Sequence, residues 1–201
     1  MTGTMSGLLI AFEGLDQSGK ETQARLLGER LPLHGGEPRF LSFPDYTTPI
    51  GQELVRALRG ERAYAPDVMQ LLFITNRYEH KPAIERWLAG GLIVICDRYR
   101  ASSVAYGEAN GVDPVWLDEI QKTLPTPDVT ILLDIPPGTG VGRKAENRDR
   151  YERDLEMLQR VRESYWRQAL QPNWVRVDGT RSIGDVALDV FSAVEPRLAR
   201  P

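Results

Sequence analysis

Residues 8–22 read Leu-Leu-Ile-Ala-Phe-Glu-Gly-Leu-Asp-Gln-Ser-Gly-Lys-Glu-Thr. The apolar run at residues 8–12 predicts a buried strand, and a helical pattern begins near Lys20. Between them, residues 14–20 match the pattern G-x-x-x-x-G-K. Glycines let successive backbone N–H groups surround a phosphate, the helix N-terminus adds partial positive charge, and the lysine can bridge the outer phosphates. The stretch therefore predicts a loop that binds a nucleoside triphosphate such as ATP, through Gly14, Leu15, Asp16, Gln17, Ser18, Gly19, Lys20, Glu21 and Thr22.

The position after Lys20 departs from this pattern. A Ser or Thr normally stands there and offers its hydroxyl to Mg²⁺, but this chain has Glu21, followed by Thr22. Either Glu21 ligates the metal itself, or Glu21 faces outward and Thr22 supplies the hydroxyl. The second arrangement is favoured, because an outward carboxylate avoids repulsion by the triphosphate and is stabilised by the helix dipole.

Composition limits the class of protein. The chain has 201 residues, of which 41% are hydrophobic and 26% charged, as expected for one globular α/β domain spanning 1–201. The net charge of -3 gives no general attraction to nucleic acid or to an anionic membrane. The single cysteine, Cys96, lies in the apolar run 92–96, which predicts a buried thiol and no disulfide. With no apparent signal peptide or membrane-spanning run, we expect a cytoplasmic protein.

Short apolar runs alternate with longer helical patterns. The runs predict five strands buried on both faces, as in a parallel sheet, at residues 8–12, 39–43, 92–96, 129–133 and 174–177. The helical patterns lie at residues 20–33, 66–89, 114–123, 152–170 and 182–199. This alternation predicts a three-layer α/β fold with a five-stranded parallel sheet flanked by helices and joined by right-handed crossovers.

Two further groups of residues suggest a second ligand. Asp97 and Arg98 directly follow the predicted strand 92–96, at the edge where α/β sheets bind ligands. Asp97 could hold Mg²⁺ through water and Arg98 could grip a phosphate, although a surface ion pair is the alternative. Phe73 and Arg77 are four residues apart in a predicted helix and share a face. They could stack on a base and donate to its carbonyl; alone, such a pair is more often a core aromatic beside a surface arginine.

Four segments taken together resemble the thymidylate kinase family. They are Glu13-Gly14-Leu15-Asp16, Phe43-Pro44, Leu72-Phe73…Asn76-Arg77 and Asp97-Arg98-Tyr99…Ser102-Ser103…Ala105-Tyr106. Residues 124–128, Asp134 and Pro136-Pro137 are similar too. The resemblance covers nearly the whole chain and implies a P-loop kinase fold with a basic lid, transfer of a phosphoryl group from ATP to dTMP with Mg²⁺, and a homodimer.

The resemblance also implies roles for single residues in binding dTMP. Phe73 would stack on thymine, Arg77 would donate to its O4, and Ser103 would lie near its N3 edge. Arg98 would hold the acceptor phosphate. The remaining dTMP-binding residues would be Asp16, near the 3′-hydroxyl and the metal; Tyr106, where a ribose 2′-hydroxyl would project; Phe43; and Tyr46, which stands where some members have an arginine.

A charged stretch at residues 143–153 has no apolar periodicity and is by itself typical of a solvated loop. Because Gln17 and Ser18 supply no arginine to the phosphate loop, the resemblance implies that this stretch is a lid that carries the catalytic cations. Arg143 would pack against adenine, and either Arg148 or Arg150 would reach the transferring phosphate, beside Lys20 and Arg98. The turn at residues 178–180 is either an adenine-edge loop or an ordinary turn.

Two rival functions share part of this pattern. A deoxynucleoside kinase has a similar loop and lid but takes an uncharged acceptor, and the Phe73/Arg77 pair with Phe43-Pro44 argues against it. A nucleotide-dependent switch would need a guanine-reading Asn/Thr-Lys-x-Asp element, which the sequence lacks.

Overall fold

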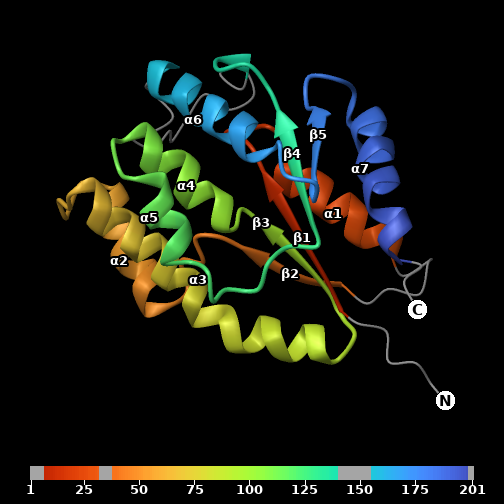
Figure 1. The fold of residues 1–201 in the computed structure, drawn as a ribbon, viewed down its shortest axis with the longest axis horizontal. Helices are drawn as coiled ribbons and strands as arrows, with labels where there is room; N and C mark the ends of the chain where they lie inside the picture. Colours follow the sequence, from red (N-terminus) through yellow and green to blue (C-terminus); the bar gives the residue numbers. More distant parts are fainter. Residues whose placement is uncertain (1–6, 32–37, 140–154, 199–201) are drawn as a thin grey trace.

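The computed structural model describes residues 7–31, 38–139 and 155–198. Its centre is a five-stranded sheet, in which all neighbouring strands are parallel and the order is β2-β3-β1-β4-β5. The strands are β1 (Leu8–Glu13), β2 (Pro38–Ser42), β3 (Ile93–Asp97), β4 (Val129–Asp134) and β5 (Trp174–Asp178). Each lies within one residue of its expected range at either end, and the predicted fold class is confirmed (Figure 1).

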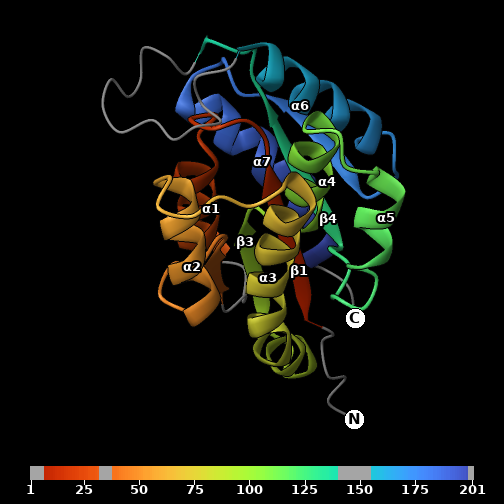
Figure 2. The ribbon, with the colours of Figure 1, turned by 90° about the vertical axis from the view of Figure 1, so that its left-hand side faces the viewer.

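Helices cover both faces of the sheet because successive strand residues point to opposite sides. Leu8, Ile10 and Phe12 of β1 share a core with helices α1 (Lys20–Arg30) and α7 (Ile183–Leu198). Leu9 and Ala11 belong to a second core on the other face. In the side view of Figure 2, α3 and α4 lie in front of the sheet and α7 lies behind it.

The second face carries five helices among the described residues. They are α2 (Pro49–Leu58), α3 (Pro66–Ala89), α4 (Arg100–Ala109), α5 (Pro114–Glu119) and α6 (Leu155–Gln168). The predicted range 66–89 matches α3, whereas α5 ends at Glu119 rather than at residue 123, because turns follow it. Helix α1 likewise ends at Arg30, earlier than the predicted residue 33.

Two of these helices were not expected from the sequence. Helix α2 begins with a cap at Thr48, whose side chain accepts a hydrogen bond from the backbone N–H of Gly51, and Pro49 occupies the first turn. Helix α4 has seven buried residues, most of them Ala, Ser or Gly, so the polar–apolar periodicity of a surface helix is missing. No described helix is long and apolar enough to span a bilayer.

The order of the strands determines where a ligand can bind. From β1 the chain forms β2 and β3 on one side and β4 and β5 on the other, so the strand order reverses beside β1. Ligands of open α/β sheets bind beyond the carboxyl ends of the strands at such a reversal. The loop after β1 and the residues after β3 therefore meet at one edge, where Phe12 is paired with Asp97.

Candidate active site

The loop after β1 has the backbone that a phosphate loop requires. Gly14 has φ +139°, and a Cβ there would lie 2.5 Å from the carbonyl oxygen of Leu133. Gly19, with φ +96°, precedes the first residue of α1. Lys20 is buried, and its Nζ donates a 2.8 Å hydrogen bond to the carbonyl oxygen of Leu15. Burial lowers the pKa of Lys20 to about 8, and the charge of Arg98 acts in the same direction.

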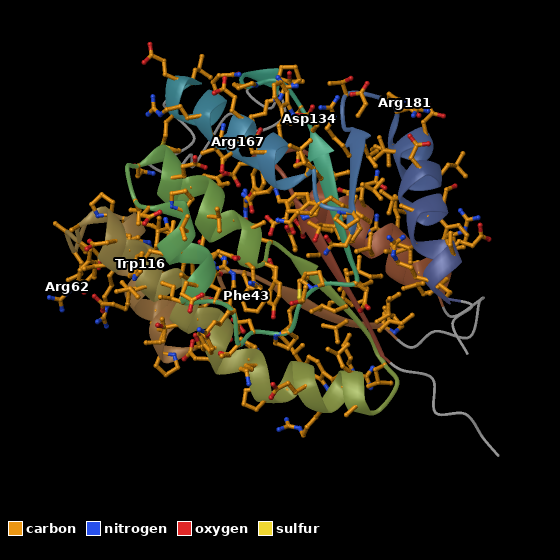
Figure 3. All side chains as sticks on the ribbon, viewed as in Figure 1. Phe43, Arg62, Trp116, Asp134, Arg167 and Arg181 are labelled. Atoms are coloured by element: carbon orange, nitrogen blue, oxygen red, sulfur yellow. The ribbon has the colours of Figure 1, made fainter. Side chains whose placement is uncertain are left out.

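A cleft of about 770 Å³ opens above this loop and forms the candidate donor pocket. Residues 16–23 line it from one side, and residues 42–44, Tyr46, Asp97 and Arg98 line it from another. Gly179, Arg181, Ile183 and Val186 complete the wall. The last three were not singled out from the sequence, because a surface arginine and two aliphatic residues at the start of a helix carry no distinctive signal. Figure 3 shows Phe43 beside α3 and Arg181 near α7, so both faces of the sheet contribute.

The donor pocket also contains groups that fit a divalent cation. Asp97 lines it, and its Oδ1 atom is buried without a hydrogen-bond partner among the described residues. Thr22 and Glu21 both line the same pocket, with Thr22 half-buried and Glu21 exposed. A carboxylate and a hydroxyl beside a triphosphate suit Mg²⁺, which keeps several waters and binds few protein groups. No group of three or more potential His, Cys, Asp or Glu ligands occurs in the described part of the chain.

A second pocket lies next to the first and forms the candidate acceptor pocket. The structure brings together in its wall all eight residues expected to bind dTMP: Asp16, Phe43, Tyr46, Phe73, Arg77, Arg98, Ser103 and Tyr106. Four residues beyond the expected set complete the wall: Pro44, Leu58, Gln70 and Ser102. Leu58 lies at the end of α2, a helix that the sequence patterns did not predict.

Arg77 is held in the wall of the acceptor pocket by two hydrogen bonds. Its side chain comes from α3 and is 2% exposed. Nη1 donates to Ser103 Oγ of α4 at 2.7 Å and to the carbonyl oxygen of Phe73 at 3.1 Å. Burial lowers the pKa of Arg77 to about 10, so the guanidinium remains charged at neutral pH. The structure therefore presents a fixed cation in the pocket wall that Phe73 also lines, with the guanidinium 5.8 Å from the centre of the Phe43 ring.

Arg98 lies where the two pockets meet. Its backbone is left-handed, with φ +63°, an uncommon conformation outside glycine. Nη2 donates to Asp16 Oδ1 at 2.6 Å and to Tyr106 OH at 3.2 Å. Burial opposes both charges, but Arg98 and Lys20 outweigh it for Asp16 and lower its pKa to about 2. Asp16 in turn raises the pKa of Arg98 above its ordinary value.

A buried polar cluster supports Arg98 from behind. Glu13, which is fully buried, accepts hydrogen bonds from the backbone N–H of Tyr99 at 2.8 Å, from Ser102 Oγ at 2.6 Å and from Tyr165 OH at 3.0 Å. These side chains were not assigned a role from the sequence. Glu13 is a single acidic residue at the end of an apolar strand, and this pattern is a sequence signal from which a functional role could have been predicted. Tyr165 is an aromatic residue among buried α6 residues and looks like ordinary core.

Five residues line both pockets: Asp16, Phe43, Pro44, Tyr46 and Arg98. A ligand in one pocket therefore borders a ligand in the other, with a carboxylate and a guanidinium at the junction. The predicted lid at 143–153, with Arg143, Arg148 and Arg150, lies outside the described residues. Of the predicted turn at 178–180, Gly179 lines the donor pocket, while Asp178 Oδ1 accepts hydrogen bonds from the N–H and hydroxyl of Thr180.

Comparison with known proteins gives a consistent assignment. The family model described as thymidylate kinase matches residues 12–190. A thymidylate kinase of Plasmodium falciparum is 36% identical, over 97% of this chain and 93% of that protein. A probable thymidylate kinase of Pyrobaculum calidifontis is 38% identical, over 96% of this chain and 98% of that protein. The solved structure of thymidylate kinase from Candida albicans superposes with a TM-score of 0.85 at 29% identity, covering 96% of this chain and 92% of that one. This chain belongs to the thymidylate kinase family.

Proposed function

We propose that this protein transfers the γ-phosphoryl group of ATP to dTMP, giving ADP and dTDP. Membership of the thymidylate kinase family supports this reaction. The observation that carries the proposal is the shared wall of the two pockets, with Arg98 and Asp16 at the junction. Phosphoryl transfer needs two ligands held in line, with positive charge around the group that moves.

The acceptor pocket has the chemistry to bind a thymine nucleotide. Phe73 offers an aromatic face for stacking, and the guanidinium of Arg77 offers donors to a carbonyl oxygen. Thymine has a carbonyl at position 4, whereas cytosine has an amino group there, which cannot accept. Ser103 holds Arg77 and has hydrogen-bonding capacity left for the N3 edge. Arg98 then holds the acceptor phosphate, while Tyr106 borders the sugar.

The donor pocket holds ATP by its phosphates. The backbone N–H groups of residues 14–20 and the charge of Lys20 bind the triphosphate, and Thr22 and Asp97 would hold Mg²⁺. When bound, the metal supplies positive charge that offsets the charge on the phosphates. We propose that Arg143 packs against adenine and that Arg148 or Arg150 reaches the transferring phosphate. We also propose that the protein is a homodimer and that it is located in the cytoplasm.

The discriminating experiment is a steady-state assay of ADP formation with dTMP, dUMP, UMP or thymidine as the acceptor. We expect the highest kcat/KM with dTMP and little ADP formation with thymidine, because thymidine lacks the phosphate that Arg98 holds. Preferred use of thymidine would identify a deoxynucleoside kinase instead. Slow ATP hydrolysis unaffected by any acceptor would indicate a nucleotide-dependent switch.

A further inference from the structure

The two terminal nitrogens of Arg98 have different surroundings. Nη2 donates to Asp16 and to Tyr106, which both line the acceptor pocket. Nη1 donates to the carbonyl oxygen of Gly14 and to Ser102 Oγ, each at 3.1 Å, and to Tyr165 OH at 3.2 Å. Both partners of Nη2 therefore line the acceptor pocket, whereas two of the three partners of Nη1, Gly14 and Tyr165, lie outside its wall.

Tyr165 reaches this point from α6 and is 1% exposed. Its hydroxyl has one hydrogen, which it donates to Glu13 Oε2 at 3.0 Å. Its lone pairs remain available, and one accepts the hydrogen bond from Arg98 Nη1. Burial raises the pKa of Tyr165, which keeps its hydroxyl protonated as this donor. Among the described residues, those that line the two pockets do not include Tyr165.

The orientation of this hydroxyl is fixed by a carboxylate that has little freedom. Glu13 is fully buried and accepts from two backbone N–H groups, those of Tyr99 and Ser102 at 2.8 and 3.3 Å. It also accepts from the side chains of Ser102 and Tyr165. A buried carboxylate with this many donors keeps them aligned, because leaving any of them unpaired would be costly.

We propose that Tyr165 is a positioning residue that orients Arg98 toward the phosphate group of the acceptor nucleotide. This inference rests on the proposed function, in which Arg98 holds the phosphate of dTMP. Tyr165 is buried behind Arg98 and acts through it. Loss of the hydroxyl therefore weakens the binding of an acceptor that carries a phosphate and leaves the binding of the corresponding nucleoside unchanged.

The test is a calorimetric titration of the full-length protein with dTMP and, separately, with thymidine. In Tyr165→Phe, which keeps the ring, we expect the Kd for dTMP to rise about three- to tenfold, the range for one hydrogen bond, with the Kd for thymidine unchanged. Tyr78→Phe is the matched control. It also removes a hydrogen-bonded hydroxyl, one that donates to the carbonyl oxygen of Ile120, from a residue outside the pocket walls. We expect it to leave the ratio of the two Kd values unchanged.

Each outcome bears on a different claim. If the parent protein binds dTMP no more tightly than thymidine, the phosphate-holding role of Arg98 in the proposed function fails. If the parent discriminates and Tyr165→Phe keeps the same ratio of Kd values, the inference about Tyr165 is wrong while the proposed function stands. Equal weakening of both ligands would assign Tyr165 a purely structural role and also overturn the inference. Calorimetry reports the Kd of the folded molecules, so partial loss of stability does not obscure the ratio.

Discussion

The hydroxyl of Ser103 accepts a 2.7 Å hydrogen bond from Nη1 of Arg77 and so joins α4 to α3 inside the acceptor pocket. Both side chains are buried, at 1% and 2% exposure. An arginine in this position loses its hydration, and the hydrogen bond fixes the plane of its guanidinium. The pair therefore acts as one unit, in which Ser103 sets the direction that Arg77 presents to a base.

Replacing Arg77 tests whether this unit reads the thymine base. We expect Arg77→Ala to lower kcat/KM for dTMP by about 1.5–3 kcal/mol, or roughly ten- to a hundredfold, because a charge-assisted hydrogen bond is lost. The KM for ATP should barely change. Ser103→Ala should cost about 0.5–1.5 kcal/mol, and the double variant should lose little more than Arg77→Ala alone. Unchanged use of dTMP by Arg77→Ala would remove this residue from the site.

Two substitutions at Tyr106 separate its ring from its hydroxyl. The hydroxyl contacts Arg98 Nη2 and Asp16 Oδ2, each at 3.2 Å, while the ring forms part of the pocket wall. If the ring excludes a 2′-hydroxyl, Tyr106→Ala should narrow the preference for dTMP over ribo-TMP, chiefly by admitting the ribonucleotide. Tyr106→Phe keeps the ring and should preserve the preference. The measurement is the ratio of kcat/KM for dTMP to kcat/KM for ribo-TMP. If Tyr106→Ala leaves this ratio unchanged, another residue excludes the 2′-hydroxyl.

The lowered pKa of Lys20 predicts that ATP binding is coupled to proton uptake. In the free protein its pKa is about 8, because burial disfavours the charged form. A bound triphosphate favours that form and raises the pKa, so binding at pH 8 takes up part of a proton and affinity falls as the pH rises above about 8. Calorimetry at pH 8 in two buffers of different ionisation enthalpy measures the uptake. Lys20→Met should abolish it, and equal heats in both buffers with the parent protein would contradict the prediction.

The unusual Glu21 provides a prediction about metal binding. Its side chain is exposed in the first turn of α1, where a carboxylate is stabilised by the helix dipole, and Thr22 is half-buried in the same pocket. We expect Glu21→Thr to keep near-normal activity and Mg²⁺ dependence, and Thr22→Val to lose much of both. Steady-state rates across a Mg²⁺ titration measure this. If Glu21→Thr lost most of its activity while Thr22→Val kept normal activity, the carboxylate of Glu21 would be the Mg²⁺ ligand.

The sequence predicted the strands better than the helices. Buried parallel strands have near-continuous apolar runs, such as residues 8–12 and 129–133, which are easy to recognise. Helix α4 was not predicted because most of its residues are small and buried, so the sequence shows no alternation of polar and apolar residues with helical periodicity. Helix α2 had a readable start at Thr48 and Pro49, but it is only ten residues long.

The residues of the candidate site, like the helices, could be predicted only where the sequence has a local pattern. Residues with a distinctive chemical group at a motif position, such as Arg98 and Tyr106, could be named in advance, and they do line the acceptor pocket. Tyr165 could not, because it lies 67 residues from Arg98 along the chain and only the packing of α6 against α4 brings them together. A hydrogen bond between residues so far apart in the chain leaves no local pattern in the sequence.

The wall that the two pockets share has a consequence for inhibitor design. A single molecule that carries both an adenosine and a thymidine, joined by a chain of phosphates, would enter both pockets through their common boundary at Arg98 and Asp16. Once one nucleoside is bound, the other is held at an effective concentration of about a millimolar or more, so affinity can exceed that of either half by about 10²–10⁴-fold. A phosphate chain too short to cross the boundary would lose this gain entirely. The number of phosphates that gives the tightest binding thus measures, in solution, how far apart the enzyme holds its two substrates.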